Sequence, residues 1–235
     1  MKEPSFKLKL LTLALLLPFN FASHASDAGR DLFNQSCAAC HSMRDNSNIS
    51  LSQRLEEKAP TLFYAGNKFN AQWLQKWLVT PGKIRAGGHF FLNKVKVTAD
   101  GDVIDESAVP QHPAVNAEQA KLLTSYLMQQ RPKSELLARE HMTPGKISKT
   151  LGDNDFHKFK GCGACHQGGD AYGGVSGPEL YTAIDRLQPG YISSYIRSPE
   201  LWDPKTLMPN RHLNDSSIKK LLDYLNTISL NTLSE

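Results

Sequence analysis

The sequence predicts an all-α protein made of two tandem copies of one small domain, with a small β-hairpin inserted in the first copy. Three observations predict it. A Cys-x-x-Cys-His motif occurs twice, proline and aromatic residues recur at one spacing, and apolar residues follow helical periodicity in both halves. A chain of 235 residues is long enough for two such domains. The expected organisation is a signal peptide (1–25), a first domain (26–131), a linker (132–149) and a second domain (150–235).

The N-terminus has the features of a secretory signal peptide. Lys7 and Lys9 precede an apolar run at residues 10–17, and residues 23–25 form a small-x-small cleavage pattern. The apolar run is well short of the ~20 residues that a membrane span needs. We therefore expect cleavage after Ala25, export to the periplasm and no transmembrane span in the mature protein.

The charge balance excludes nucleic-acid binding as a main function. The chain has 27 Lys and Arg against 23 Asp and Glu, a formal net charge of +4. Removal of residues 1–25 takes away three lysines and one glutamate, which leaves +2. The sequence contains no block of Lys and Arg and no interleaving of basic with aromatic residues, so it lacks the pattern of a nucleic-acid-binding surface.

Two motifs carry the chemistry: residues 35–42 read QSCAACHS and residues 161–167 read GCGACHQ. Two thiols three residues apart can reach the two vinyl groups of one porphyrin, and the next residue places an imidazole on its iron. On a helical turn, the first Cys and the His share a face. The sequence therefore predicts two covalently bound haem c groups. The attachment sites are Cys37, Cys40, Cys162 and Cys165, and the proximal iron ligands are His41 and His166.

Two other uses of these cysteines compete with haem attachment. A zinc site could use all four thiolates, but it would leave the His after each pair without a role. A thioredoxin-like redox pair needs a strand before the motif and a helix after it, and the chain shows no βαβ pattern. Cysteines of exported proteins usually form disulfides. Here haem attachment would use all four thiols and leave none for a disulfide or for the iron.

The spacing of proline and aromatic residues repeats between the halves. Thirteen residues separate Pro60 from Trp73, and thirteen separate Pro178 from Tyr191. The segment WLQKWLVTP that begins at Trp73 then matches YISSYIRSP that begins at Tyr191. Further along each half, AEQAKLLTSYL matches DSSIKKLLDYL. Matches at three places in the same order predict a duplicated domain.

Each half is predicted to be helical. Ser26 or Asp27 can cap a first helix that leads to Cys37. WLQKWL and YISSYI place apolar residues at i, i+1, i+4 and i+5, and each segment ends before a proline, Pro81 or Pro199. AEQAKLLTSYL and DSSIKKLLDYL have the apolar periodicity of a final helix.

The first half carries 22 extra residues. Pro81 and His112 are 31 residues apart, whereas Pro199 and Met208 are 9 apart. The extra segment includes KVKVTADGDVID at residues 94–105, in which two alternating stretches flank an Asp-Gly turn. This pattern predicts a β-hairpin near the distal side of the first haem.

These motifs resemble the class I cytochrome c family, and within it the diheme members made of two fused domains. The resemblance covers nearly all of the chain after residue 25. It implies that a proline helps to hold each ligating His, a role that falls to Pro178 and to Pro60, where Ala59 replaces the family's glycine. In that family the sixth iron ligand is usually the Met of a Met-Pro pair, here Met208.

The first half departs from the family pattern at the sixth ligand. It has no Met-Pro pair, and His112-Pro113 stands in its place. His112 precedes Tyr126 by 14 residues, as Met208 precedes Tyr224 by 16. The repeat therefore predicts His112 as the distal ligand of the first haem, although a lone His in a proline-flanked loop can also be a surface residue.

The predicted iron ligands are His41 with His112 in the first half, and His166 with Met208 in the second. His89, which follows two glycines, is the main rival of His112. Met ligation raises a haem potential, whereas a second imidazole lowers it. The resemblance implies a periplasmic electron carrier that takes electrons from a periplasmic or membrane-bound donor at the first haem and passes them to an acceptor from the second.

An enzyme is the alternative function. If neither His112 nor His89 bound the iron, the first haem would have an open position. It could then act on peroxide, a nitrogen oxide or a sulfur compound. For an electron carrier, no catalytic residue is expected.

Overall fold

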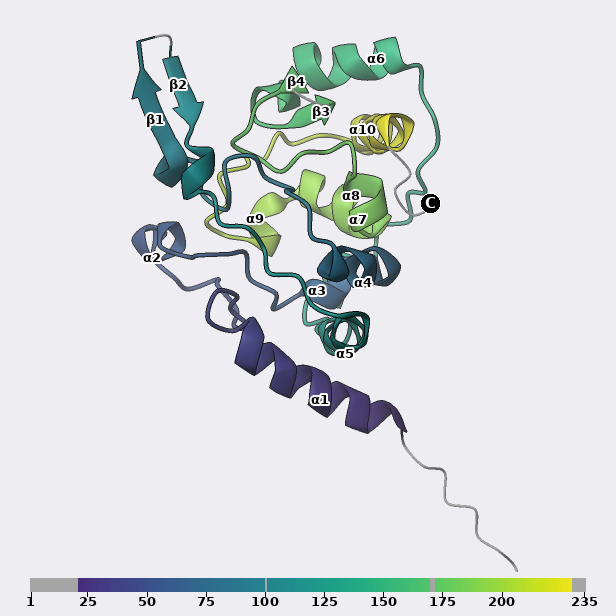
Figure 1. Cartoon of the computed structure of the whole chain (residues 1–235). Coiled ribbons are helices and arrows are strands. Elements are labelled where there is room, and N and C mark those ends of the chain that lie inside the picture. The colour runs from purple at the N-terminus through teal and green to yellow at the C-terminus, as the bar shows by residue number, and fades with distance from the viewer. Residues whose placement is uncertain (1–20, 100, 170–171, 230–235) are drawn as a thin grey trace, which may run out of the picture.

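The computed structural model describes residues 21–99, 101–169 and 172–229 (Figure 1). The signal peptide prediction falls largely on residues 1–20, outside the described residues, so cleavage after Ala25 stays a prediction. Over the described ranges, no helix combines the length and the apolar character needed to cross a bilayer.

The elements of the chain are short and mostly helical. Up to residue 131 they are α1 (Phe21–Ser36), α2 (Leu51–Leu55), α3 (Ala65–Lys68), α4 (Ala71–Val79), η1 (Phe91–Lys94), β1 (Val95–Thr98), β2 (Gly101–Ile104), η2 (Glu106–Ala108) and α5 (Ala117–Leu127). After it come η3 (Ser134–Leu136), α6 (Lys149–Asp153), the π-helix η4 (Asn154–Phe159), η5 (Cys162–Ala164), β3 (Gln167–Gly169), β4 (Tyr172–Gly173), α7 (Ala183–Arg186), α8 (Pro189–Arg197), α9 (Pro199–Trp202) and α10 (Asp215–Ile228).

The expectation of an all-α protein built from two tandem class I cytochrome c domains is wrong. The chain is of mixed structure, about 48% helical, with two small antiparallel sheets, and it shows no clear tandem cytochrome c fold. The hairpin expected over residues 94–105 does form, as β1 and β2. The second sheet, β3–β4, was not expected. It follows the second motif in the glycine-rich run QGGDAYGG, a composition that disfavours helix.

Gly173 shows why this second sheet depends on glycine. Its φ is +120°, and an added Cβ would meet the carbonyl oxygen of His166 at 2.2 Å. Only glycine adopts this backbone conformation readily. The strand pair can therefore lie directly against the second Cys-x-x-Cys-His motif.

Asparagine residues begin several of the helices. The side chain of Asn116 accepts a hydrogen bond from the backbone of Gln119 at the start of α5, and Asn214 accepts one from Ser217 at the start of α10. An Asn in this position satisfies an N–H group that has no partner within the helix. The first helix differs from prediction, because Ser26 and Asp27 lie within the described part of α1 instead of capping its start.

The repeat is clearest in one pair of helices from each half. α3 and α7 have four residues each, and α4 and α8 have nine. α4 ends before Pro81 and α8 ends before Pro199, as the proline positions predicted. Figure 1 shows these helices near the centre of the molecule, whereas the hairpin β1–β2 projects away from the body.

Two equivalent backbone hydrogen bonds join the halves at this helix pair. The N–H of Asn70 donates to the carbonyl of Arg186 at 2.8 Å, and the N–H of Gln188 donates to the carbonyl of Lys68 at 2.9 Å. Between them the residues after Lys68 and Arg186 form a single antiparallel bridge. The four residues occupy corresponding positions of the repeat, so the contact has local two-fold symmetry.

An aromatic cluster fills the space beside this contact. Tyr64, Tyr191 and Trp202 are 6%, 5% and 2% exposed, and their ring centroids are 4.7–6.2 Å apart. The indole N–H of Trp202 donates to the hydroxyl of Ser194 at 3.0 Å, so its polar atom is also satisfied. Tyr64 belongs to the first half and the other rings to the second. The halves therefore share this part of the core.

Gly29 permits the close packing of α1 against α5. A Cβ on Gly29 would meet the carbonyl oxygen of Leu122 at 2.3 Å and the Cβ of Tyr126 at 2.8 Å. We predict that Gly29→Ala lowers the free energy of unfolding by ~1–3 kcal/mol, because the helices must separate. Gly82→Ala is the control, since nothing lies within 4 Å of a Cβ there. Equal denaturation midpoints for the two variants would contradict this prediction.

Candidate functional site

Both Cys-x-x-Cys-His motifs form the same helical turn. The N–H of His41 donates to the carbonyl of Cys37 at 3.0 Å, and the N–H of His166 donates to that of Cys162 at 3.1 Å. In each motif the first cysteine is half-buried, the second is exposed and both thiols are free. The turn places the first cysteine and the histidine on one face, which is the arrangement that attachment to one porphyrin requires.

The surroundings of the thiols do not fit the two competing uses of these cysteines, a thioredoxin-like redox pair and a zinc site. Burial, with a smaller contribution from Cys40, raises the pKa of Cys37, and burial raises the pKa of Cys162 to about 11. A thioredoxin-like pair instead needs a lowered thiol pKa. No group of three or more His, Cys, Asp and Glu side chains in the described ranges could hold a metal ion, so the four thiolates do not gather for zinc.

The two motif histidines are oriented in the same way. Nδ1 of His41 lies 2.8 Å from the carbonyl oxygen of Pro60, and Nδ1 of His166 lies 2.8 Å from that of Pro178. Because a carbonyl only accepts, Nδ1 carries the proton and Nε2 keeps a free lone pair. A metal-ligating histidine needs this tautomer. Burial lowers the pKa of both imidazoles, which favours the neutral form that binds a metal.

His112 lies opposite His41. Their ring centroids are 6.2 Å apart and their planes are tilted by 52°. Two imidazoles that share one metal, each bonded at about 2.0 Å, place their ring centroids about 6 Å apart. Nδ1 of His112 lies 2.9 Å from the carbonyl oxygen of Pro113, which again leaves Nε2 free. The two side chains that the sequence paired thus have the separation and the tautomers of axial ligands.

Trp77 holds His112 in this position. The Trp77 ring lies 4.5 Å from the His112 ring, centroid to centroid, and the indole N–H donates to the carbonyl of Gly82 at 3.1 Å. Trp73 stacks on Trp77 at 5.5 Å. A column of aromatic rings from α4 therefore restricts the rotation of the predicted distal ligand.

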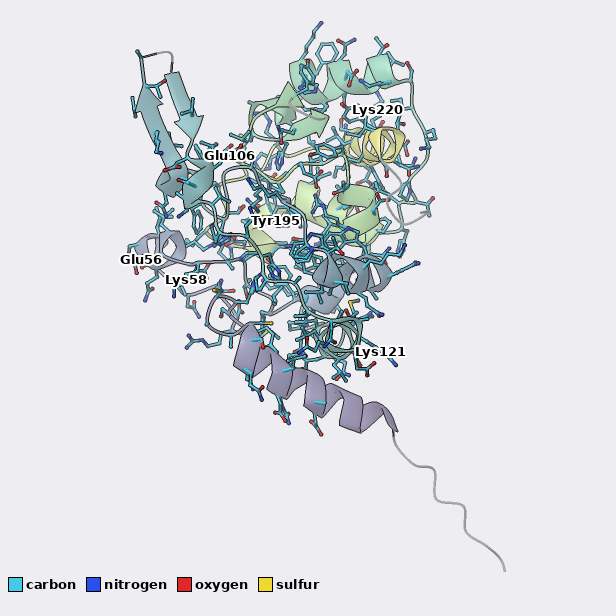
Figure 2. The ribbon with its side chains drawn as sticks, viewed as in Figure 1. Glu56, Lys58, Glu106, Lys121, Tyr195 and Lys220 are labelled. Carbon is cyan, nitrogen blue, oxygen red and sulfur yellow. The ribbon has the colours of Figure 1, made fainter. Side chains whose placement is uncertain are left out.

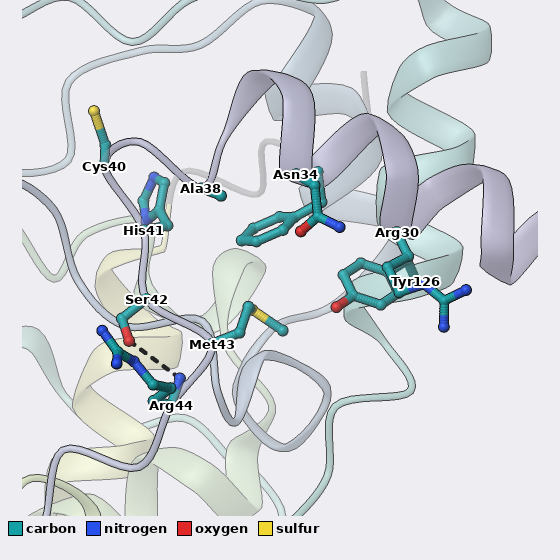
Figure 3. A pocket seen from close by; sticks show the side chains of 10 residues that line it. Arg30, Asn34, Ala38, Cys40, His41, Ser42, Met43, Arg44 and Tyr126 are labelled. Carbon is teal, nitrogen blue, oxygen red and sulfur yellow. Dashed lines mark hydrogen bonds between the residues drawn. The ribbon is translucent and has the colours of Figure 1, made fainter.

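A pocket of about 390 Å³ opens beside His41 (Figure 3). Its lining includes Phe33 of α1 and Tyr126 of α5, together with Cys40 and Met43 in and beside the motif. The volume is within the range of ~300–1,000 Å³ found for small-molecule and cofactor sites. The first motif therefore borders a pocket of mixed lining, which also includes the polar side chains of Arg30, Asn34 and Arg44.

His89, the rival distal ligand, is engaged elsewhere. Its Nε2 lies 2.8 Å from Nη1 of Arg54, a group that only donates, so the Nε2 lone pair is in use. The side chain is 7% exposed. Burial, and then the charges of Arg54 and Arg85, lower the pKa of His89 to about 2. His112 is therefore better placed than His89 to bind a metal.

Met208 lies on the irregular segment between α9 and α10. It is half-buried, and its N–H donates to the hydroxyl oxygen of Thr206 at 3.2 Å. Thr206 also hydrogen-bonds with the hydroxyl of Tyr195 at 2.9 Å, which anchors the segment on α8. The pairing of Met208 with His166 stays a prediction.

The sequence reasoning missed the charged residues between the halves. Arg54 of α2 contacts Asp203, which follows α9 and is 149 residues away. Lys68 and Arg186 flank the symmetric contact described above. One signal could have indicated them, because Lys68 and Arg186 are both basic at corresponding positions of the repeat.

Comparison of the chain with protein-family models, curated proteins and solved structures finds no match. The function is therefore inferred from the residues of the site alone. They are the two motif turns, the histidine–proline hydrogen bonds and the facing pair His41 and His112.

Proposed function

We propose that this chain is a diheme c-type cytochrome that transfers single electrons between redox partners. One observation carries the proposal. In both motifs the same turn and the same hydrogen bond to a proline carbonyl leave the Nε2 lone pair of the histidine free. A structural histidine has no need of this repeated arrangement, whereas an axial iron ligand requires it.

The residues present fit two covalent haem groups. Cys37 and Cys40 would hold the first through its vinyl groups, and His41 and His112 would supply its axial nitrogens. Cys162 and Cys165 would hold the second, with His166 and Met208 as axial ligands. When bound, each haem supplies one-electron chemistry between ferrous and ferric iron.

The ligands give the transfer a direction. His41 and His112 present two imidazoles to the first site, and an imidazole donates more strongly than the thioether of Met208. The site of His41 and His112 would then give its haem the lower potential, so it would take electrons from a periplasmic or membrane-bound donor. The site of His166 and Met208 would pass them to an acceptor. An enzyme with an open position at the first iron has less support, because the His112 ring lies 6.2 Å from the His41 ring, centroid to centroid.

Haem content and ligation test the proposal directly. The protein, expressed in cells that attach haem c, should carry two covalent haems per chain by mass spectrometry. Replacing Cys37 and Cys40 together by serine, or Cys162 and Cys165 together, should leave one haem in each case, because each pair holds its own porphyrin. Redox titration should then give the lower potential to the haem at His41. Absence of covalent haem from the exported protein would contradict the function.

A further inference from the structure

Arg54 of α2 joins three segments of the chain. Its Nη1 donates to the carboxylate of Glu57, just after α2, and to Nε2 of His89 in the extra segment of the first half. The guanidinium also lies over the ring of Phe90, 4.9 Å from its centroid. Nε and Nη2 donate to Oδ2 of Asp203 at 3.1 Å and 2.5 Å. A side chain of the first half therefore binds a carboxylate of the second.

Asp203 holds the start of the segment that carries Met208. Its Oδ1, which lies 3.4 Å from Nε of Arg54, also accepts the N–H of Lys205 at 3.1 Å. The backbone carbonyl of Asp203 accepts the N–H of Thr206 at 2.9 Å. Asp203 is 8% exposed, so water competes little for these bonds. The carboxylate that Arg54 binds thus fixes the first turn after α9.

Thr206 continues this chain of contacts to Met208. The hydroxyl oxygen of Thr206 accepts the N–H of Met208 at 3.2 Å. The same hydroxyl lies 2.9 Å from that of Tyr195, which Figure 2 shows near the centre of the molecule. Hydrogen bonds therefore run from Arg54 through Asp203 and Thr206 to the backbone of Met208.

The helix before this segment is held by a separate contact. Nζ of Lys133 donates to the carbonyls of Leu201 and Trp202 at 2.7 Å and 3.2 Å, at the end of α9. The N–H of Lys133 donates in turn to the side chain of Asn67 at 3.2 Å. The end of α9 thus keeps an anchor when Arg54 is replaced. Such a replacement acts on the Asp203 carboxylate and on the turn that follows it.

We propose that Arg54 is a positioning residue for Met208, the predicted sixth iron ligand of the second haem. Through Asp203 and Thr206, the first half holds the segment that presents the thioether. This inference rests on the proposed function. A methionine side chain has three rotatable bonds, so the backbone that presents its sulfur must be held for the sulfur to stay on the iron. Ligation in the second half would then depend on its contact with the first.

Variants of this chain of contacts test the inference in the haem-loaded protein. Arg54→Gln and Asp203→Asn should both lower the reduction potential of the second haem and weaken the charge-transfer absorption of thioether-bound ferric iron, because Met ligation raises the potential. A charge effect alone would shift the potential in opposite directions, since one variant removes a cation and the other an anion. Thr206→Val, which changes no charge, should act as they do, whereas Thr206→Ser keeps the hydroxyl and should retain the band.

Glu57→Gln is the matched control, because Glu57 binds the same guanidinium from within the first half. It should leave the potential and the absorption of the second haem unchanged. Amide hydrogen exchange supplies a readout that does not depend on the iron. The N–H groups of Lys205 and Met208 should exchange about tenfold faster in Arg54→Gln than in wild type, as expected when one hydrogen bond to a charged group is lost.

The possible outcomes distinguish this inference from the proposed function. With the charge-transfer band present in wild type, an unchanged band in both Arg54→Gln and Asp203→Asn would overturn the positioning role, even if the potentials shifted in opposite directions. Absence of the band from the haem-loaded wild type would instead overturn the ligation by Met208, and absence of covalent haem would overturn the function. If Arg54→Gln does not fold, Asp203→Asn still decides, because a lowered potential there opposes the charge effect.

Discussion

Replacement of Arg54 by alanine is expected to lower the free energy of unfolding by about 3–5 kcal/mol, the cost of removing one partner of a buried ion pair. Nε of Arg54 donates to the carboxylate of Asp203 at 3.1 Å, and Nη1 binds Glu57 and His89. The side chains of Arg54 and Asp203 are 11% and 10% exposed. Without the guanidinium, two carboxylates would stay in a poorly solvated place with no cation beside them.

The control for Arg54 is an arginine that forms an exposed pair. Arg30 lies 2.9 Å from Asp27 on the same helix, and these side chains are 55% and 58% exposed. Arg30→Ala should cost about 0–1 kcal/mol, because solvent screens such a pair. Urea denaturation followed by circular dichroism measures both variants. Equal losses would show that the contact between Arg54 and Asp203 contributes no more than a surface pair.

Replacement of His112 by alanine is expected to open the first iron. The His112 ring lies 6.2 Å from the His41 ring, centroid to centroid, whereas the rival His89 is bound by Arg54. Low-temperature electron paramagnetic resonance of the oxidised protein should change from two low-spin signals to one low-spin and one high-spin signal. Added imidazole should restore the low-spin signal, because it can occupy the space of the lost side chain.

Two further variants make the His112 result specific. His112→Met should keep the first haem low-spin but raise its potential, since a thioether donates less than an imidazole. His141→Ala removes an exposed histidine of the linker and should change neither spectrum nor potential. A high-spin signal already present in wild type would contradict the assignment of His112 and favour an enzyme.

The parts of the fold that were predictable are local. Proline ends α4 and α8 at the expected residues, and the hairpin forms within residues 94–105 as the alternating pattern predicted, although Gly101 is the first residue of β2. The proximity of the His41 and His112 rings could also be predicted, because the repeat aligned His112 with Met208, while their binding of one iron stays a prediction. These signals lie within a few residues of the feature, or come from comparing one half with the other.

The parts that failed depend on contacts across the chain. The glycines after His166 form strands because they pack against the motif, and sequence periodicity does not show this. The contact between Arg54 and Asp203 joins residues 149 apart. His89 looked like a free ligand for the same reason, since its partner Arg54 is 35 residues away.

Because the backbone contact between the halves is symmetric, the surface that each half presents to the other is self-complementary. Each half offers one N–H donor and one carbonyl acceptor in the same geometry, so two separate copies of such a segment could close a dimer with two-fold symmetry. In one polypeptide, a tether supplies the second copy at an effective concentration in the millimolar range. An attraction far too weak to hold two free molecules together at cellular concentration is then sufficient to keep the halves closed.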